Sequence, residues 1–162
     1  MRAYTYSEYG SPDVLEFTEV ERPTPKDDEV LIKVRAASLN PLDWHLMRGK
    51  PLFIRLMFGG LRKPKIRRPG RDVAGQVEAV GRNVTRFKPG DEVFGACIGS
   101  CAEYVCTAED NLALKPANTS FEDAAAVPVA AITALQGLRD KGRIQRGQRV
   151  LVDGASGGVG TF

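Results

Sequence analysis

Alternating hydrophobic and polar positions dominate residues 29–114 and predict a series of short β-strands. Residues 29–36 and 71–80 place small or branched apolar side chains at every second position, which is the period of a half-buried strand. Shorter runs of the same kind lie at 92–96, 102–107 and 111–114. Glycine and proline pairs separate the runs, as in Pro69-Gly70 and Pro89-Gly90. We therefore expect residues 1–118 to form a mainly β, barrel-like domain.

After residue 118 the pattern acquires a helical period. Ser120 is placed to cap a helix whose first turn carries Glu122 and Asp123. Pro128 breaks or kinks this helix, residues 130–139 resume it, and Gly142 ends it. We assign residues 119–162 to connecting helices followed by the start of a second domain.

A glycine-rich turn marks that second domain. Residues 148–152 predict a buried strand, and a helix is expected to begin around Gly158. This is the order of the first βα turn of a dinucleotide-binding fold, where Gly157 lets the backbone approach a pyrophosphate and Gly160 lets the helix pack on the strand. Such turns also occur for packing alone. Because only about a dozen residues follow Arg149, we expect the domain to be unfinished.

Charge is distributed unevenly along the chain. The segment from Trp44 to Arg71 holds nine basic residues and no acidic one, whereas the remainder holds 14 basic and 20 acidic residues, a net −6. Such a segment suits a nucleic-acid or membrane surface, a cofactor with several phosphates, or a solvated loop. Residues 51–61 add seven large apolar side chains, and we expect them to fold over the barrel mouth and to line an apolar substrate entrance; a helix resting on a membrane surface is the alternative.

Composition indicates a globular, cytoplasmic protein. Of the residues, 43% are hydrophobic and 27% are charged, and no apolar run approaches the ~18 residues that span a bilayer. The first residues contain no apolar signal core. The three cysteines, at 97, 101 and 106, are odd in number and close together, which argues against a disulfide framework and fits reduced thiols.

Six stretches, in this order along the chain, resemble the medium-chain dehydrogenase/reductase superfamily and its zinc-independent quinone oxidoreductase-like branch. They are residues 37–44, 69–75, 80–84, 89–95, 102–105 and 154–160. The resemblance implies a GroES-like barrel domain followed here by the truncated start of a Rossmann domain. It also implies hydride transfer from NADPH to a quinone or an α,β-unsaturated carbonyl compound.

Metal chemistry is not expected. Catalytic zinc needs three cysteine, histidine or carboxylate ligands around an open position, and structural zinc usually takes four cysteines. Zinc-dependent members of the resembled superfamily have a cysteine where this chain has Asn40 and a histidine where it has Arg71. Three cysteines cannot complete a four-cysteine site, and we read the segment from Cys97 to Cys101 as a loop with partly buried thiols.

The resemblance also supplies candidate site residues. It places Asn40 and Asp43 beside the nicotinamide and the substrate, and it makes His45 a proton donor where lysine is common. Trp44 stands where tyrosine is common, so that hydroxyl is missing. The alternative for residues 40–43 is a turn with an Asx cap, and for His45 a satisfied structural histidine.

Cofactor contacts are implied for Thr133, at the carboxamide, and for the phosphate turn formed by Ala155, Gly157, Gly158, Val159 and Gly160. Ala155 replaces the first glycine of the dinucleotide fingerprint, a form that resembles the NADPH-preferring reductases. The residues that would read the ribose lie about 20 positions further on. The preference for NADPH therefore rests on resemblance.

Two function classes follow. The first is a zinc-independent reductase of a small molecule, present here as an N-terminal part that is inactive alone. The second is a non-catalytic GroES-like β-module that self-associates. For the first class we expect a homo-oligomer that binds neither nucleic acid nor a membrane by stable insertion.

Overall fold

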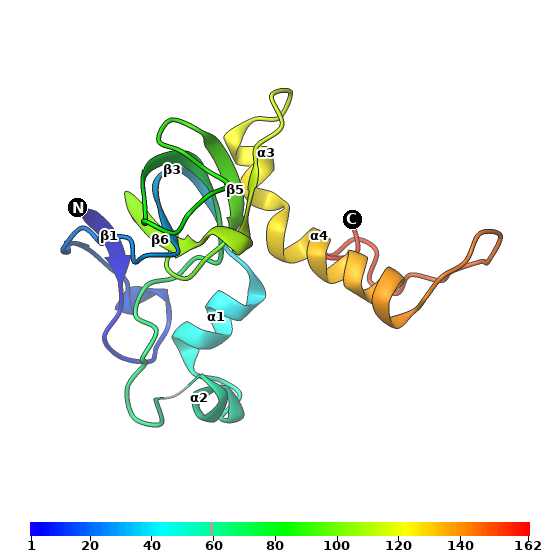
Figure 1. The fold of residues 1–162 in the computed structure, drawn as a ribbon. Helices are drawn as coiled ribbons and strands as arrows, with labels where there is room; N and C mark the ends of the chain where they lie inside the picture. The colour runs from blue at the N-terminus through cyan, green and yellow to red at the C-terminus, as the bar shows by residue number, and fades with distance from the viewer. Residues whose placement is uncertain (59) are drawn as a thin grey trace.

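A five-stranded antiparallel sheet forms the centre of the computed structural model, which describes residues 1–58 and 60–162 (Figure 1). Its strand order is β6–β3–β4–β5–β7, and it curls around a core of valine and isoleucine side chains. The strands are β3 (Glu29–Ser38), β4 (Asp72–Val80), β5 (Glu92–Ala96), β6 (Tyr104–Ala108) and β7 (Leu112–Leu114). The predicted mainly β, barrel-like domain is confirmed.

Two register shifts in the β3–β4 pair, between Leu31 and Ile32 and between Val34 and Ala36, bend the sheet. Between them, a Cβ on Gly75 would lie 2.3 Å from the Lys33 carbonyl oxygen, so only glycine permits this close approach of the strands. The pairing ends with Ser38 opposite Asp72. It thereby brings a hydroxyl and a carboxylate together at the edge of the barrel.

An N-terminal hairpin was not predicted. Strands β1 (Arg2–Thr5) and β2 (Glu16–Glu19) pair antiparallel, with a single 3-10 turn, η1 (Pro12–Val14), between them. Nearly all of β2 is exposed, so it carries no alternation of buried and exposed positions that a pattern search could detect. The hairpin joins the barrel through an isolated bridge between Ala3 and Ala102.

Two helices follow β3. Helix α1 (Pro41–Arg48) begins with a proline in its first turn and ends at Gly49, whose φ is +59°. Helix α2 (Phe53–Met57) lies at the end of α1 remote from the barrel strands (Figure 1). The prediction that residues 51–61 fold over the barrel mouth is therefore wrong. Gly59, one of these residues, lies outside the described part of the chain.

A second helical segment leads away from the barrel. Helix α3 (Phe121–Ala126) starts as predicted, with the Ser120 hydroxyl oxygen accepting a bond from the Asp123 N–H at 3.0 Å. It packs Ala124 and Ala125 against Ala74 of β4. Helix α4 (Pro128–Leu135) continues into a π-helical turn, η3 (Gln136–Lys141). Earlier in the chain, a 3-10 turn, η2 (Glu109–Asn111), precedes β7. The boundary proposed at residue 118 stays a prediction.

The strand predicted at 148–152 and the helix predicted from Gly158 are absent from the described residues. A strand needs a neighbour for its N–H and C=O groups, and Leu151 is instead 94% exposed. One hydrogen bond, from the Thr161 N–H to the Gly157 carbonyl at 3.0 Å, closes a single turn. One turn is below the length at which helices are stable in water. Among the described residues, no helix has both the length and the apolar character to cross a bilayer.

Candidate active site

An apolar cavity of about 350 Å³ lies between the N-terminal hairpin and the first turns of α1. Its walls come from four segments of the chain: Tyr4, Pro12, Leu15, Leu39, Asn40, Asp43, Trp44, Met47, Pro69 and Cys101. Two of the three predicted catalytic residues, Asn40 and Asp43, therefore share one cavity. Most of the remaining lining is apolar, which suits a flat, weakly polar ligand.

Asn40 is held from behind by a buried carboxylate. Its Nδ2 donates to Asp72 Oδ2 at 2.8 Å, and the Ser38 hydroxyl donates to the same oxygen at 2.8 Å. Asp72 is only 1% exposed. A bond from a neutral amide to a buried carboxylate is stronger than an ordinary neutral pair, so the orientation of the Asn40 amide is fixed.

The second oxygen of Asp72 reaches the other helical segment. Asp72 Oδ1 accepts a hydrogen bond from the Val129 N–H at 3.0 Å, in the first turn of α4. One carboxylate thus joins β4, the junction of β3 with α1, and α4. The sequence analysis missed Asp72; its available signal was a carboxylate directly before the apolar residues Val73 and Ala74 at the start of a predicted strand.

Asp43 uses both carboxylate oxygens to hold backbone. Oδ2 accepts from the Asn40 N–H at 2.8 Å, and Oδ1 accepts from the Gly70 N–H at 2.9 Å. The first bond is the return half of a capping box, so residues 40–43 are the beginning of α1 and not an isolated turn. The second bond ties Gly70, which follows the lining residue Pro69, to the helix. Burial, together with the nearby Asp43 charge, raises the pKa of Tyr6 to about 12.

His45 is in the same helix as Asp43 but is not among the residues that line the cavity. Its Nδ1 is 2.8 Å from the Lys50 carbonyl oxygen, and its ring meets Trp44 edge-on with centroids 4.7 Å apart. The structure therefore does not bring His45 together with Asn40 and Asp43. Its role as a proton donor stays a prediction.

Thr133 and part of the glycine turn line a second cavity, of about 630 Å³. Gly157, Val159 and Gly160 face it, whereas Ala155 and Gly158 are not among its lining residues. The Thr133 hydroxyl donates to the Val129 carbonyl at 2.6 Å, which leaves its oxygen able to accept a further bond.

Gly160 packs within its own turn, because a Cβ there would lie 2.3 Å from the Gly154 carbonyl oxygen. This replaces the predicted packing of a helix on a strand, which is absent here because neither element forms.

The three cysteine thiols are candidates for metal ligation or nucleophilic attack. Among the described residues, no group of three or more histidine, cysteine or carboxylate side chains is arranged to hold a metal ion. Burial is the largest cause that raises the pKa of Cys97 to about 12 and those of Cys101 and Cys106 to about 11. Metal ligation and nucleophilic attack need the thiolate, so these thiols are poor at both near neutral pH. Whether the protein is independent of zinc stays a prediction.

Alkaline pH should destabilise the fold through Cys97. The folded state keeps a proton on this thiol up to about pH 12, whereas an unfolded thiol loses it near 9.0. Between these values the unfolded state binds fewer protons, so the free energy of unfolding falls by up to about 1.4 kcal/mol per pH unit for this thiol. Urea unfolding at several pH values should show a shallower decline in Cys97→Ala than in the unmodified protein. Equal declines would contradict the assignment.

Comparison with known proteins places the chain in a family. Residues 26–137 match the family model of the alcohol dehydrogenase GroES-like domain. The chain is 43% identical over 173 residues to 2-methylene-furan-3-one reductase of Solanum lycopersicum, covering 100% of this chain and 42% of the relative. It is 39% identical over 164 residues to quinone oxidoreductase of Homo sapiens, covering 99% and 47%.

A crystal structure of Escherichia coli quinone oxidoreductase complexed with NADPH has the same fold, with a TM-score of 0.84 and 28% identity over 99% of this chain and 47% of the other. The chain spans about half the length of the curated relatives that it matches. The family model covers well over half of this chain, and the relatives are quinone oxidoreductases and enone reductases. The chain belongs to the alcohol dehydrogenase GroES-like domain family, within the medium-chain dehydrogenase/reductase superfamily.

Proposed function

We propose that this chain forms the substrate-binding part of a zinc-independent reductase that transfers a hydride from NADPH to a quinone or an α,β-unsaturated carbonyl compound. The observation that carries the proposal is the Asn40 amide, which lies in the wall of an apolar cavity and is oriented by the buried Asp72. An oriented amide beside an apolar ligand supplies a hydrogen bond where charge develops on a substrate oxygen, without needing a metal.

The other residues around this cavity position the substrate and exclude water. Leu15, Leu39 and Met47 give it apolar walls that fit a planar enone or quinone ring. Asp43 holds Gly70 and the start of α1 in place through its two backbone bonds. Trp44 has no hydroxyl, so a proton for the reduced substrate has to come from water or from another residue.

The second cavity has features that suit a dinucleotide. The oxygen of Thr133 can accept a bond from a carboxamide, and Gly157, which has no side chain, lies in the same cavity wall. When bound, NADPH supplies the hydride. Relatives support this choice, since one from Arabidopsis thaliana is named NADPH-dependent alkenal/one oxidoreductase. Asn40 and Thr133 line different cavities, so hydride transfer would require the nicotinamide of a bound cofactor to reach the substrate beside Asn40.

Replacing Asn40 should sharply reduce quinone reduction. Because a dinucleotide-binding fold needs a paired sheet, we expect negligible NADPH oxidation by the 162 residues alone. The assay therefore uses the chain fused to the remaining sequence of the human relative. In this fusion, Asn40→Ala should lower kcat by about 100-fold, the loss typical of removing one oriented hydrogen-bonding group. The measurement is NADPH oxidation at saturating quinone.

The matched control is Asn118→Ala, which removes the same side chain from an exposed loop and should leave kcat unchanged. Dialysis against a chelator should also leave kcat unchanged. Full activity of Asn40→Ala would contradict the assigned role. Loss of activity on chelation, restored by zinc, would contradict the metal-free mechanism. No NADPH oxidation by a folded fusion that forms concentration-dependent dimers would favour the self-associating module instead.

A further inference from the structure

The nine basic residues between Trp44 and Arg71 are left without acidic partners. Among the described residues, none of the nine takes part in an ion pair. The five most accessible to solvent are Lys50, Arg62, Lys63, Lys65 and Arg67. An uncompensated cluster of this size creates a positive field directed at whatever lies outside it.

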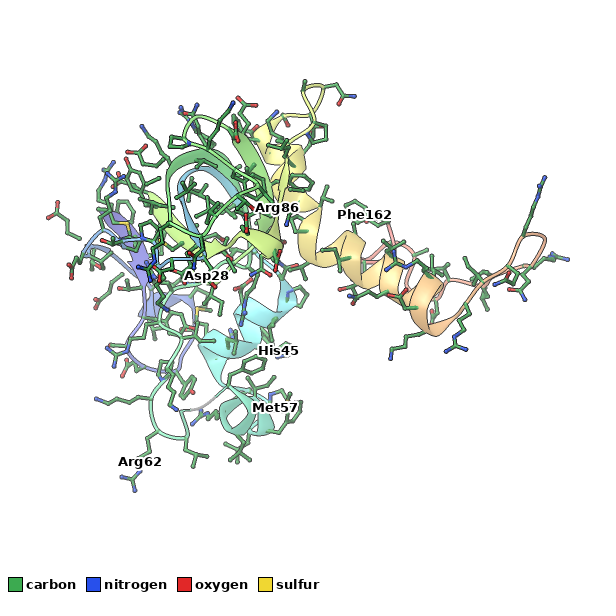
Figure 2. All side chains as sticks on the ribbon, in the orientation of Figure 1. Asp28, His45, Met57, Arg62, Arg86 and Phe162 are labelled. Atoms are coloured by element: carbon green, nitrogen blue, oxygen red, sulfur yellow. The ribbon has the colours of Figure 1, made fainter. Side chains whose placement is uncertain are left out.

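This cluster lies away from the proposed cofactor cavity. Figure 2 shows Arg62 projecting from one end of the molecule, while Phe162, a lining residue of that cavity, lies on the opposite side of α1. None of the nine basic residues lines that cavity. The basic segment therefore does not serve the cofactor phosphates in this structure.

Large apolar side chains stand within the same end of the molecule. Leu52 and Leu56, and likewise Phe53 and Met57, are four residues apart and share one face of α2. That face points to solvent, with Leu56 64% and Met57 70% exposed. Leu61 extends the exposed apolar surface beyond the helix. A surface helix usually turns its apolar face toward the core, whereas α2 turns these apolar side chains outward.

Contacts on the inner side hold α2 in this orientation. Ile54 is buried against the body of the protein. Arg55 donates to the Gly49 carbonyl at 2.9 Å and to the Leu61 carbonyl at 3.3 Å, and its guanidinium stacks 4.2 Å from the Tyr9 ring centroid. The outward apolar face is therefore fixed by contacts to the body of the protein.

We propose that this basic apolar tip, formed by Lys50, α2 and residues 60–67, docks the protein on an anionic lipid surface. Lysine and arginine near such a surface are attracted to its headgroups, and exposed leucine, phenylalanine and methionine enter the boundary with the acyl chains. Nucleic acid would satisfy the charges but would leave the apolar face in water. An anionic lipid surface satisfies both features, because its headgroups attract the accessible basic residues and its acyl boundary takes up the apolar face.

The test is co-sedimentation of the 162-residue protein with vesicles. Binding is expected to vesicles of phosphatidylcholine with about one third phosphatidylserine, and to weaken as salt rises above about 0.1 M. Vesicles of phosphatidylcholine alone should bind at least tenfold less. Arg62→Glu with Lys63→Glu should reduce binding to the anionic vesicles at least tenfold, because each basic residue contributes about 1 kcal/mol. Leu56→Ser with Met57→Ser should also reduce it severalfold.

Matched controls distinguish binding through this tip from effects of net charge and of exposed apolar side chains elsewhere on the protein. Lys33→Glu with Arg35→Glu makes the same charge change on exposed positions of β3, and Leu114→Ser with Leu151→Ser removes two other exposed leucines. Both controls should bind as the unmodified protein does. The proposal is overturned by equal binding to neutral vesicles, or by tip variants that bind normally. It is also overturned if the tip binds only duplex DNA, or if Leu56→Ser with Met57→Ser abolishes a protein dimer and not lipid binding.

Discussion

Replacing Asp72 by alanine should lower the free energy of unfolding by about 3–5 kcal/mol, because it removes both oxygens of a carboxylate that accepts three hydrogen bonds. The Ser38 hydroxyl, the Asn40 amide and the Val129 N–H all donate to this 1%-exposed carboxylate. Each of these half-buried donors would lose its partner. Chemical unfolding monitored through the single tryptophan, Trp44, measures the loss.

Two variants show that the effect belongs to this site. Asp72→Asn keeps the volume and one acceptor oxygen, so it should be less damaging than Asp72→Ala. Asp27→Ala removes a carboxylate whose ion pair with Arg82 is exposed on both sides, and exposed pairs contribute about 0–1 kcal/mol. If Asp72→Ala lowered the free energy of unfolding no more than Asp27→Ala does, the three hydrogen bonds would not stabilise the fold.

The barrel strands were accessible from sequence because their signal is local. Each of the five predicted runs became a strand of the central sheet, with ends shifted by two residues at most. Half-buried strands impose their period on the sequence, and glycine and proline mark the turns between them. The β1–β2 hairpin escaped because β2 is largely exposed, so nothing constrains its alternate positions.

Two other failures share a different cause, which is dependence on a partner distant in the sequence. Residues 148–152 have the composition of a buried strand, yet without a neighbouring strand they have no ladder to join. Asp72 meets Ser38 only through the β3–β4 register, and meets Val129 only through the placement of α4. Neither contact produces a sequence pattern from which it could be predicted.

Asn40 and Thr133 illustrate what resemblance adds and where it stops. Resemblance proposed both, and the structure places each in the wall of a cavity. The resemblance did not reveal that one carboxylate supports both sites. Asp72 binds the Asn40 side chain and also the first turn of the helix that carries Thr133. A shift of α4 would therefore be felt at Asn40, which gives the two proposed sites a common mechanical support.

Gly70→Ala should destabilise the protein by about 2–5 kcal/mol and open the wall of the apolar cavity. Gly70 has a φ of +98°, a conformation that L-residues adopt only at a penalty of about 1–2 kcal/mol. A Cβ would also lie 2.2 Å from Ser100 Oγ and 2.9 Å from the Cys101 backbone nitrogen. Ser100 is fully buried and cannot move aside freely, so overpacking adds about 1–3 kcal/mol.

Gly90→Ala separates these two causes, because Gly90 has nearly the same φ, +96°, but nothing lies within 4 Å of its Cβ position. It should show only the backbone penalty of about 1–2 kcal/mol. Urea unfolding of the two variants gives the difference in stability. Alkylation of Cys101, whose thiol lines the cavity, gives the local readout and should quicken in Gly70→Ala alone. Equal losses of stability and unchanged alkylation would mean that the chain around Gly70 accepts a Cβ without strain, and that the bond from Gly70 to Asp43 does not hold the cavity in shape.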